Sequence, residues 1–237
     1  ATTLHNAAFY NCRKLKKLSV GTAISGIGSD EFMNDSQLEH LIIRGKDSEA
    51  TGLPLILERI AENITVSFCP NSSSSPESIV FFPEYYEWLD EISPAHIFSR
   101  SIHGEGFRMR KSFENGILNY RKYDSCLENA LTVESPESLC KIALNRLRWP
   151  SRLEDIFREK YENVIKKYMG TAFTLAVKDQ DFPMLQFICE HFSPDASALA
   201  SAIDQCIEKE WGEGNAFLIE AKHKSFSKKT FDFDLDF

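Results

Sequence analysis

Apolar residues in the first third of the chain recur with one spacing. A template of three positions appears three times at a constant period: Leu15, Leu18 and Val20, then Leu38, Leu41 and Ile43, then Ala61, Ile64 and Val66. A template repeated at a fixed period is typical of stacked repeats, in which neighbouring copies bury one another's apolar side chains. The period therefore predicts three short strands lying side by side. The alternative is ordinary strands whose spacing is accidental.

The third copy carries two further features. Cys69 follows Val66 by three positions, and the preceding segment 51–64, TGLPLILERIAENI, is predicted as a helix with Leu55, Ile56 and Ile60 on its apolar face. Residues 4–71 resemble leucine-rich repeats of the cysteine-containing kind, LxxLxLxxC. The resemblance implies β/α arches with an exposed face beside the strands. The candidate partner contacts there are Lys16, Lys17, Ser19, Glu39, His40 and Ile42.

Residues 72–123 are interpreted as an aromatic-rich linker and capping region. The serine-rich stretch PNSSSSPES, bounded by prolines, is predicted as a loop. The stretch 79–89, IVFFPEYYEWL, has two interpretations. It covers the open end of the repeat stack, or it is an exposed aromatic surface where a partner docks.

From about residue 124 the pattern predicts successive helices. The stretch 170–192 divides into two helices around KDQDF and resembles the ankyrin repeat, with a second copy starting at SALASAI, 197–203. A third candidate begins at 138–144, where Ala143 precedes Ala176 by one ankyrin period. The region 124–225 is therefore interpreted as ankyrin-like hairpins, with a generic helical bundle as the alternative.

One segment of this region has a second resemblance. Residues 134–157, ESPESLCKIALNRLRWPSRLEDIF, are similar to the SOCS or VHL-type box, which binds elongin and a cullin in ubiquitin ligases. The resemblance implies that Cys140 and Leu144 are partner contacts. Any buried amphipathic helix shows the same side chains, so exposure of Cys140 and Leu144 separates the two interpretations.

The final segment, 226–237, alternates apolar and acidic residues in TFDFDLDF. Alternation predicts an extended strand with one apolar side, here including Phe231, Phe233 and Phe237. Such a tail either folds back on its own protein as an edge strand or is a linear motif that binds a partner.

Composition narrows the class of partner. The chain of 237 residues is 43% hydrophobic, enough for a substantial core, and its net charge of −8 disfavours nucleic acid, whose phosphates need a basic surface. Its apolar runs are too short to cross a bilayer, so membrane insertion is not expected. Six dispersed cysteines favour a reducing intracellular compartment, cytoplasmic or nuclear.

Residues for catalysis or metal binding are sparse. The stretch SIHGEGF offers His103 and Glu105, which together with Cys126 could form a thiol-dependent hydrolase if a cleft gathers them. A plain Gly-Glu-Gly turn is the simpler interpretation. The CEH triplet 189–191 lacks the spacing for shared metal ligation on a helix. No catalytic residue, metal or cofactor is assigned.

Together these patterns predict an α+β fold, mainly α, in which a short leucine-rich-repeat-like β/α region precedes ankyrin-like helical hairpins in a solenoid. Solenoids expose long surfaces, so the expected function is non-catalytic binding of other proteins, extending to an elongin–cullin adaptor. A hydrolase on an irregular helical scaffold is the alternative.

Overall fold

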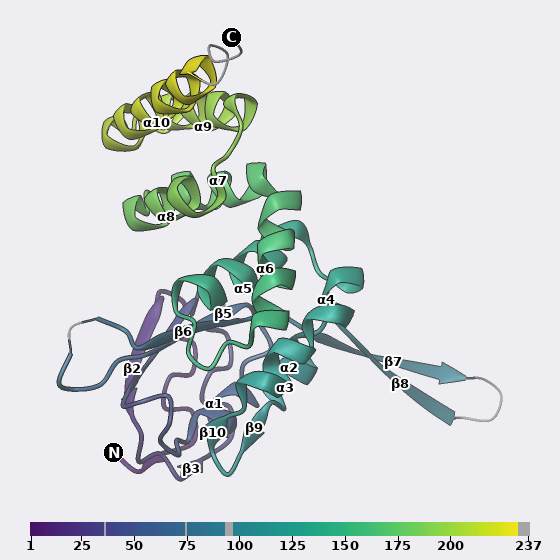
Figure 1. The fold of residues 1–237 in the computed structure, drawn as a ribbon. Coiled ribbons are helices and arrows are strands. Elements are labelled where there is room, and N and C mark those ends of the chain that lie inside the picture. Colours follow the sequence, from purple (N-terminus) through teal and green to yellow (C-terminus); the bar gives the residue numbers. More distant parts are fainter. Residues whose placement is uncertain (36, 74, 93–96, 232–237) are drawn as a thin grey trace. The chain divides into compact units, whose positions relative to one another are not determined.

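The computed structural model describes residues 1–35, 37–73, 75–92 and 97–231 and is mixed α+β (Figure 1). It divides into two compact units, residues 1–158 and 159–237. This division falls well after residue 124, where the sequence pattern placed the start of a separate helical region. The helices between residues 120 and 148 therefore belong to the first unit.

The first unit contains short strands and helices, with strands predominating before Gly106 and helices after Leu118. They are β1 Thr3–Leu4, β2 Lys17–Gly21, β3 Gly26–Ile27, β4 His40–Arg44, α1 Leu53–Leu57, β5 Ile64–Phe68, β6 Ser78–Phe82, β7 Tyr86–Ile92, β8 Ile97–His103, α2 Gly106–Arg110, β9 Phe113–Glu114, β10 Ile117–Leu118, α3 Tyr120–Ser125, α4 Leu127–Val133 and α5 Pro136–Arg148. Helix α6, Asp155–Lys167, crosses the division between the units.

The central sheet has the order β2-β4-β5-β6, with the first three strands parallel and β6 antiparallel to β5. Lys17 pairs with His40, a separation that equals the apolar period. His40 pairs with Thr65 and not with Asn63, so the predicted alignment of the third copy was wrong by two positions. A shift of two keeps every side chain on its face of the sheet, and Ile64, Val66 and Phe68 are all buried.

The backbone of the first two coils repeats with the same period as the apolar template. Left-handed residues occur in matched pairs, Ala7 (φ 58) with Asp30 (φ 60) and Asn11 (φ 61) with Asn34 (φ 69). Turn hydrogen bonds match as well: Tyr10 N to Ala7 O with Met33 N to Asp30 O, Cys12 N to Phe9 O with Asp35 N to Phe32 O, and Leu15 N to Cys12 O with Leu38 N to Asp35 O. The apolar template therefore coincides with a repeated backbone conformation.

The core lies on one face of the sheet, where α1 contributes buried Leu53, Ile56 and Leu57. Side chains of the first copy are less covered than those of the second, because β2 is an edge strand. At the other edge, β6 ends the parallel run and buries Val80 and Phe82. The first half of the aromatic stretch therefore covers the outer edge of β5.

Two buried guanidinium groups hold helices of the first unit in place, that of Arg146 between α5 and α3 and that of Arg110 between α2 and the sheet region. Arg146 on α5 donates to both carboxylate oxygens of Asp124, at 2.8 and 2.9 Å. Arg110 on α2 donates to the backbone carbonyls of Ile60, Glu62, Pro83 and Gly106. Helix α5 packs against β6, which explains why it belongs to the first unit.

The second unit contains helical hairpins. Its helices are α7 Met169–Lys178, α8 Phe182–Phe192, α9 Ala196–Glu208 and α10 Gly212–Phe231. The two predicted helices around KDQDF are confirmed as α7 and α8. Contacts join α7 to α8 and to α9, and α10 to α9 and to α8.

The two hairpin turns have the same hydrogen bonds. Gln180 N bonds Val177 O and Glu210 N bonds Ile207 O, while Asp181 N bonds Ala176 O and Trp211 N bonds Cys206 O. Gln180 (φ 48) and Glu210 (φ 54) are both left-handed. The ankyrin period proposed from Ala143 and Ala176 is longer than the separation of these turns, and Ala143 lies on α5 in the first unit.

The tail prediction fails over residues 226–231, which belong to α10 and are not extended. The apolar–acidic alternation begins only at Phe231, whereas the preceding KSFSKKT contains no glycine or proline to end a helix. Phe231 is the last residue of α10, and Phe233 and Phe237 lie outside the described residues.

Candidate functional site

The six predicted contacts beside the repeat strands lie together. Strand register places Lys17 beside His40 and Ser19 beside Ile42, all on the face of the sheet opposite the inward Leu41 and Ile43. Lys16 and Glu39 are joined through the bond from Glu39 N to Lys16 O. Five of the six side chains are exposed and Ile42 is half-buried. The outward side chains of Lys17, Ser19, His40, Ile42, Arg44, Thr65 and Ser67, with the exposed side chains of Lys16 and Glu39 directly before β2 and β4, are called the strand face below.

The strand face has the opposite charge to the whole chain. It contains Lys16, Lys17 and Arg44, and the acidic Glu39, while the chain carries −8. Arg44 Nε donates to Ser19 Oγ at 3.0 Å, which fixes the guanidinium across the two strands. A basic face on an acidic protein attracts acidic partner surfaces.

A second exposed surface is a two-stranded antiparallel ribbon, β7 with β8, which is called the arm below. In Figure 1 the arm extends away from the sheet and helices of the first unit. Tyr86, Trp88 and Leu89 are 59%, 56% and 65% exposed. The second half of the aromatic stretch is therefore not a cap, and large apolar exposure of this kind marks interaction sites.

The register divides the arm into two faces. Tyr86 pairs with His103 and Trp88 with Ser101 on one face, and the rings of Tyr86 and His103 stack at 4.9 Å. Glu87 forms an ion pair with Arg100. The indole Nε1 of Trp88 donates to Asp90 Oδ1 at 2.5 Å. Stacking on His103 thus orients the ring of Tyr86, and the hydrogen bond to Asp90 orients that of Trp88.

Cys140 and Leu144 do not form an exposed docking surface. Both side chains are 0% exposed on α5, and this helix packs against β6. Helix α5 begins after Ser135, whose side chain accepts from Ser138 N, and Pro136 occupies its first turn. The burial of Cys140 and Leu144 favours the interpretation of α5 as a core helix over its interpretation as a docking box.

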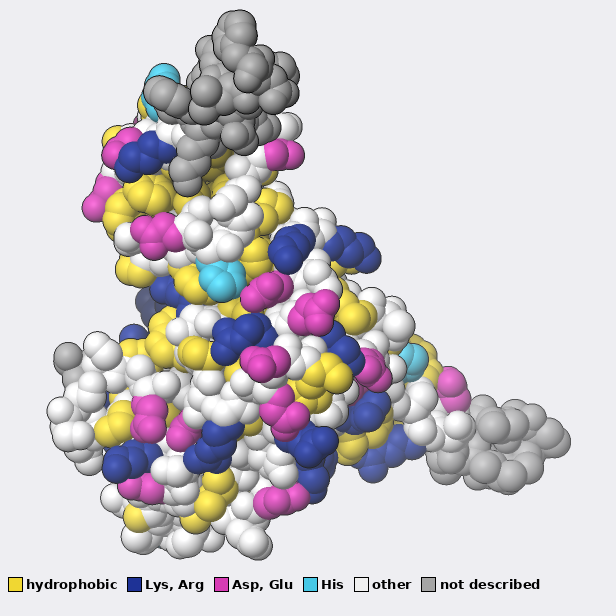
Figure 2. All heavy atoms as spheres, in the orientation of Figure 1, with side chains coloured by type: hydrophobic (Ala, Val, Ile, Leu, Met, Phe, Trp, Pro, Cys, Tyr) yellow, Lys and Arg dark blue, Asp and Glu magenta, His cyan; other side chains and the backbone are white. Residues whose placement is uncertain are grey.

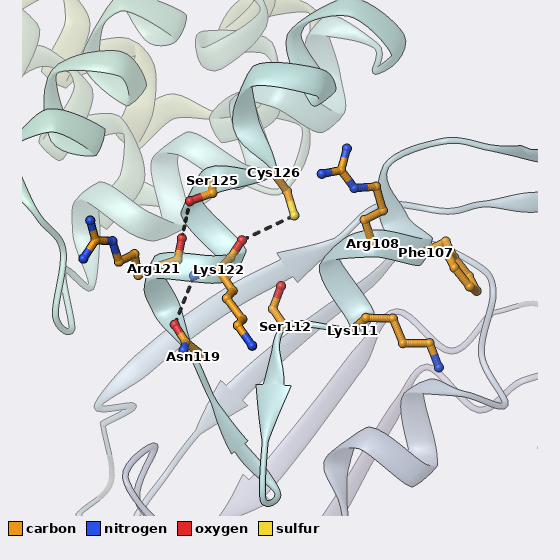
Figure 3. Close-up of a pocket in the computed structure, with 9 residues that line it drawn as sticks. All are labelled: Phe107, Arg108, Lys111, Ser112, Asn119, Arg121, Lys122, Ser125 and Cys126. Atoms are coloured by element: carbon orange, nitrogen blue, oxygen red, sulfur yellow. Dashed lines mark hydrogen bonds between the residues drawn. The ribbon is translucent and has the colours of Figure 1, made fainter.

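A hollow of about 530 Å³ lies between α2 and α3 (Figure 3). Its lining includes four cationic side chains, those of Arg108, Lys111, Arg121 and Lys122, and no carboxylate. In Figure 3, Arg108 and Lys111 project from the α2 side and Lys122 from the α3 side, while Arg121 extends away from them. This charge pattern raises the question of an anion site.

Each of these four cations is already within 4 Å of a glutamate. The pairs are Arg108 with Glu105, Lys111 with Glu58, Arg121 with Glu154 and Lys122 with Glu114, at 3.5, 3.1, 3.7 and 2.5 Å. Figure 2 shows Lys and Arg side chains interspersed with Asp and Glu on the visible face of the molecule. The hydroxyl of Ser125 and the thiol of Cys126 donate to backbone carbonyls. The local charge is thus balanced, and the hollow is better explained as a surface ion-pair network.

The residues of the alternative hydrolase are not arranged for nucleophilic catalysis. His103 is exposed on the arm, where it stacks on Tyr86 and lies 3.2 Å from Ser101 Oγ. Glu105 is buried near Cys126 and accepts a hydrogen bond from Asn129. Burial, and then the negative charge of Glu105, raises the pKa of the Cys126 thiol to about 11. A protonated thiol is a poor nucleophile at neutral pH.

Two other kinds of site are missing from the part of the chain that the structure describes. Among the described residues, no three His, Cys, Asp or Glu side chains are grouped to hold a metal ion. None of the described helices combines the length and apolar character needed to cross a bilayer. No protein-family model, curated protein or solved structure matches this chain.

Sequence reasoning located the strand face but did not locate the arm as a separate element. The signal was present in YYEWLDE, where glutamate and aspartate interrupt the aromatic residues. A cap is apolar throughout, as in IVFF, whereas carboxylates within a strand indicate exposure to water.

Proposed function

We propose that this chain is a non-catalytic protein that holds another protein on its strand face. In this proposal the leucine-rich-repeat-like coils of residues 1–71 and the helical hairpins of the second unit are repeat scaffolds. The observation that carries the proposal is the register of β2, β4 and β5. It assembles Lys17, Ser19, His40 and Ile42 into one continuous, solvent-facing surface.

The chemistry of the strand face favours an acidic partner. Lysine and arginine around a half-buried Ile42 place charged side chains at the rim and an apolar side chain at the centre, as the polar rim and apolar core of protein interfaces do. Partner carboxylates would compete with water for the exposed Lys16 and Lys17, an interaction that salt weakens.

An elongin–cullin adaptor would be a narrower form of this proposal. The burial of Cys140 and Leu144, the contacts expected for an adaptor, speaks against it. Cys140 and Leu144 would have to leave the core of the first unit to reach elongin. That exposure costs about 2 kcal/mol or more for a leucine side chain alone. We therefore place the partner surface on the strand face.

The experiment is affinity capture from extract with the intact chain and with a Lys16→Glu, Lys17→Glu variant. We expect the variant to lose the captured proteins, and added salt to release them from the unmodified chain. A matched variant, Lys209→Glu with Lys178→Glu, changes the net charge equally on exposed helix-end positions of the second unit. Retention by the first variant, or equal loss in both, would contradict a role for the strand face.

A further inference from the structure

The arm has two unpaired edges. Within the described residues, β7 and β8 form a sheet of two strands and neither pairs with a third. The outer edge of β7 therefore presents backbone N–H and C=O groups over Tyr86–Ile92. Such an edge is a template for an added strand, and an isolated two-stranded ribbon gains stability from one.

The side chains of the arm define the chemistry of that added strand. Residues 86–103 contain three carboxylates and one arginine, a net charge of −2. Glu87, which is paired with Arg100, and Asp90, which accepts from Trp88 Nε1, are interspersed with the exposed Tyr86, Trp88 and Leu89. Acid beside exposed indole and phenol favours lysine or arginine, through both Coulomb attraction and cation–π contact.

We propose that β7 of the arm binds a basic, extended segment of a partner protein by strand addition. Backbone hydrogen bonds along Tyr86–Ile92 supply the pairing. Successive residues of β7 point to opposite faces, so Trp88 and Asp90 share one face of the arm and Glu87 lies on the other. Lysines at alternate positions of the partner strand lie on one face, where they reach Asp90 and the ring of Trp88 in one register and Glu87 in the other. Directly opposed cross-strand neighbours are about 5 Å apart.

Two occupants from this chain itself are disfavoured by charge. A second copy that paired β7 with β7 would bring the carboxylates of Glu87 and Asp90 close to their equivalents, and like charges opposite one another destabilise a sheet. Residues 232–237 carry three aspartates and would meet the same repulsion. The strand face is basic, so it favours a partner of opposite charge to the one proposed for the arm.

The test uses the intact chain and a short peptide of alternating lysine and valine, with isothermal titration calorimetry and amide hydrogen exchange. We expect binding together with slowed exchange of the β7 amides. A glutamate–valine peptide should bind about tenfold more weakly or not at all because its charge is reversed. A lysine–valine peptide with a central proline at a position whose amide would face β7 should also lose about tenfold, because proline removes that hydrogen-bond donor.

Variants connect the binding to the arm. Glu87→Lys with Asp90→Lys should weaken the lysine–valine peptide about tenfold. Glu159→Lys with Glu208→Lys changes the net charge equally at exposed helix positions and should leave the affinity within about twofold. Lys16→Glu with Lys17→Glu should also leave it unchanged, which separates this test from that of the strand face.

Several results would overturn the proposal. They are no binding of the lysine–valine peptide, equal binding of all three peptides, exchange protection outside β7, or a concentration-dependent dimer that disappears in Trp88→Ala. Circular dichroism of each variant shows whether the fold is retained, and the peptide comparison on the unmodified chain needs no variant.

Discussion

At the scale of single residues, a substitution at Leu144 distinguishes between α5 as a core helix and α5 as a docking box. The Leu144 side chain is fully buried, so truncation removes packed atoms and leaves a cavity. We expect Leu144→Ala to lower the free energy of unfolding by about 2 to 5 kcal/mol in urea denaturation. Leu131→Ala on α4, where the leucine is 43% exposed, should change it by about 0.5 kcal/mol or less. A stable Leu144→Ala variant that loses a bound partner would restore the docking-box interpretation.

The cysteines give a second residue-scale prediction, which addresses the hydrolase alternative. Burial raises the pKa of Cys126 to about 11 and that of Cys140 to about 12, so both thiols are protonated at pH 7 and become thiolates only in more alkaline solution. Cys12 is exposed. We expect brief alkylation of the native chain at pH 7 to label Cys12, as located by peptide mass spectrometry, and Cys12→Ser to remove this rapid labelling. Rapid labelling of Cys126 at pH 7 would contradict its assignment as a packed thiol.

At the scale of elements, the two hairpin turns of the second unit make a matched pair. Gln180 and Glu210 adopt left-handed backbone at equivalent positions after α7 and α9, a conformation that glycine adopts without steric cost. Gln180→Gly and Glu210→Gly should each raise the free energy of unfolding by up to about 1 kcal/mol, as measured in urea. Thr174→Gly, at an exposed position inside α7, should lower it by about 1 kcal/mol. Destabilisation by all three changes would show that the turns are not strained.

The apolar period predicted the strands of the central sheet correctly but misaligned the third of them by two residues. Leu18, Leu41 and their neighbours predicted the parallel strands because inward residues must stack, and the apolar period survives as the register between β2 and β4. The alignment at Val66 was two positions out because side-chain alternation has a period of two, so a shift of two leaves the pattern of inward residues unchanged. The connection between β4 and β5 contains α1, and its length could not be predicted from the apolar period alone.

Features that depend on contacts between residues far apart in the sequence could not be predicted from the local pattern of apolar and polar residues. Cys140 and Leu144 have the same spacing whether a helix packs inside or binds a partner, and the decision comes from β6, a strand much earlier in the chain. Glu84, Glu87 and Asp90 marked the arm as exposed, but nothing local indicated that, within the described residues, β7 pairs with β8 alone. The strand face could be predicted because its register follows directly from the repeat.

At the scale of the whole molecule, charge is distributed unevenly over an acidic chain. The strand face carries Lys16, Lys17 and Arg44, whereas the arm carries Glu87 and Asp90. A protein with a basic and an acidic surface can hold two partners of opposite charge, and binding to each should weaken as salt rises. The balanced hollow between α2 and α3 adds no third surface, because each of its cations already has a carboxylate nearby.

The most direct measurement of the central claim places a photo-crosslinking amino acid at His40, in the middle of the strand face, and at the exposed Asp204 on α9 as a control. After irradiation in extract, we predict a protein adduct from position 40 that is absent from position 204. The adduct should disappear when Lys16→Glu and Lys17→Glu are added. Adducts that are the same from both positions, or that persist after the charge reversal, would contradict the account that this chain holds its partner on the strand face.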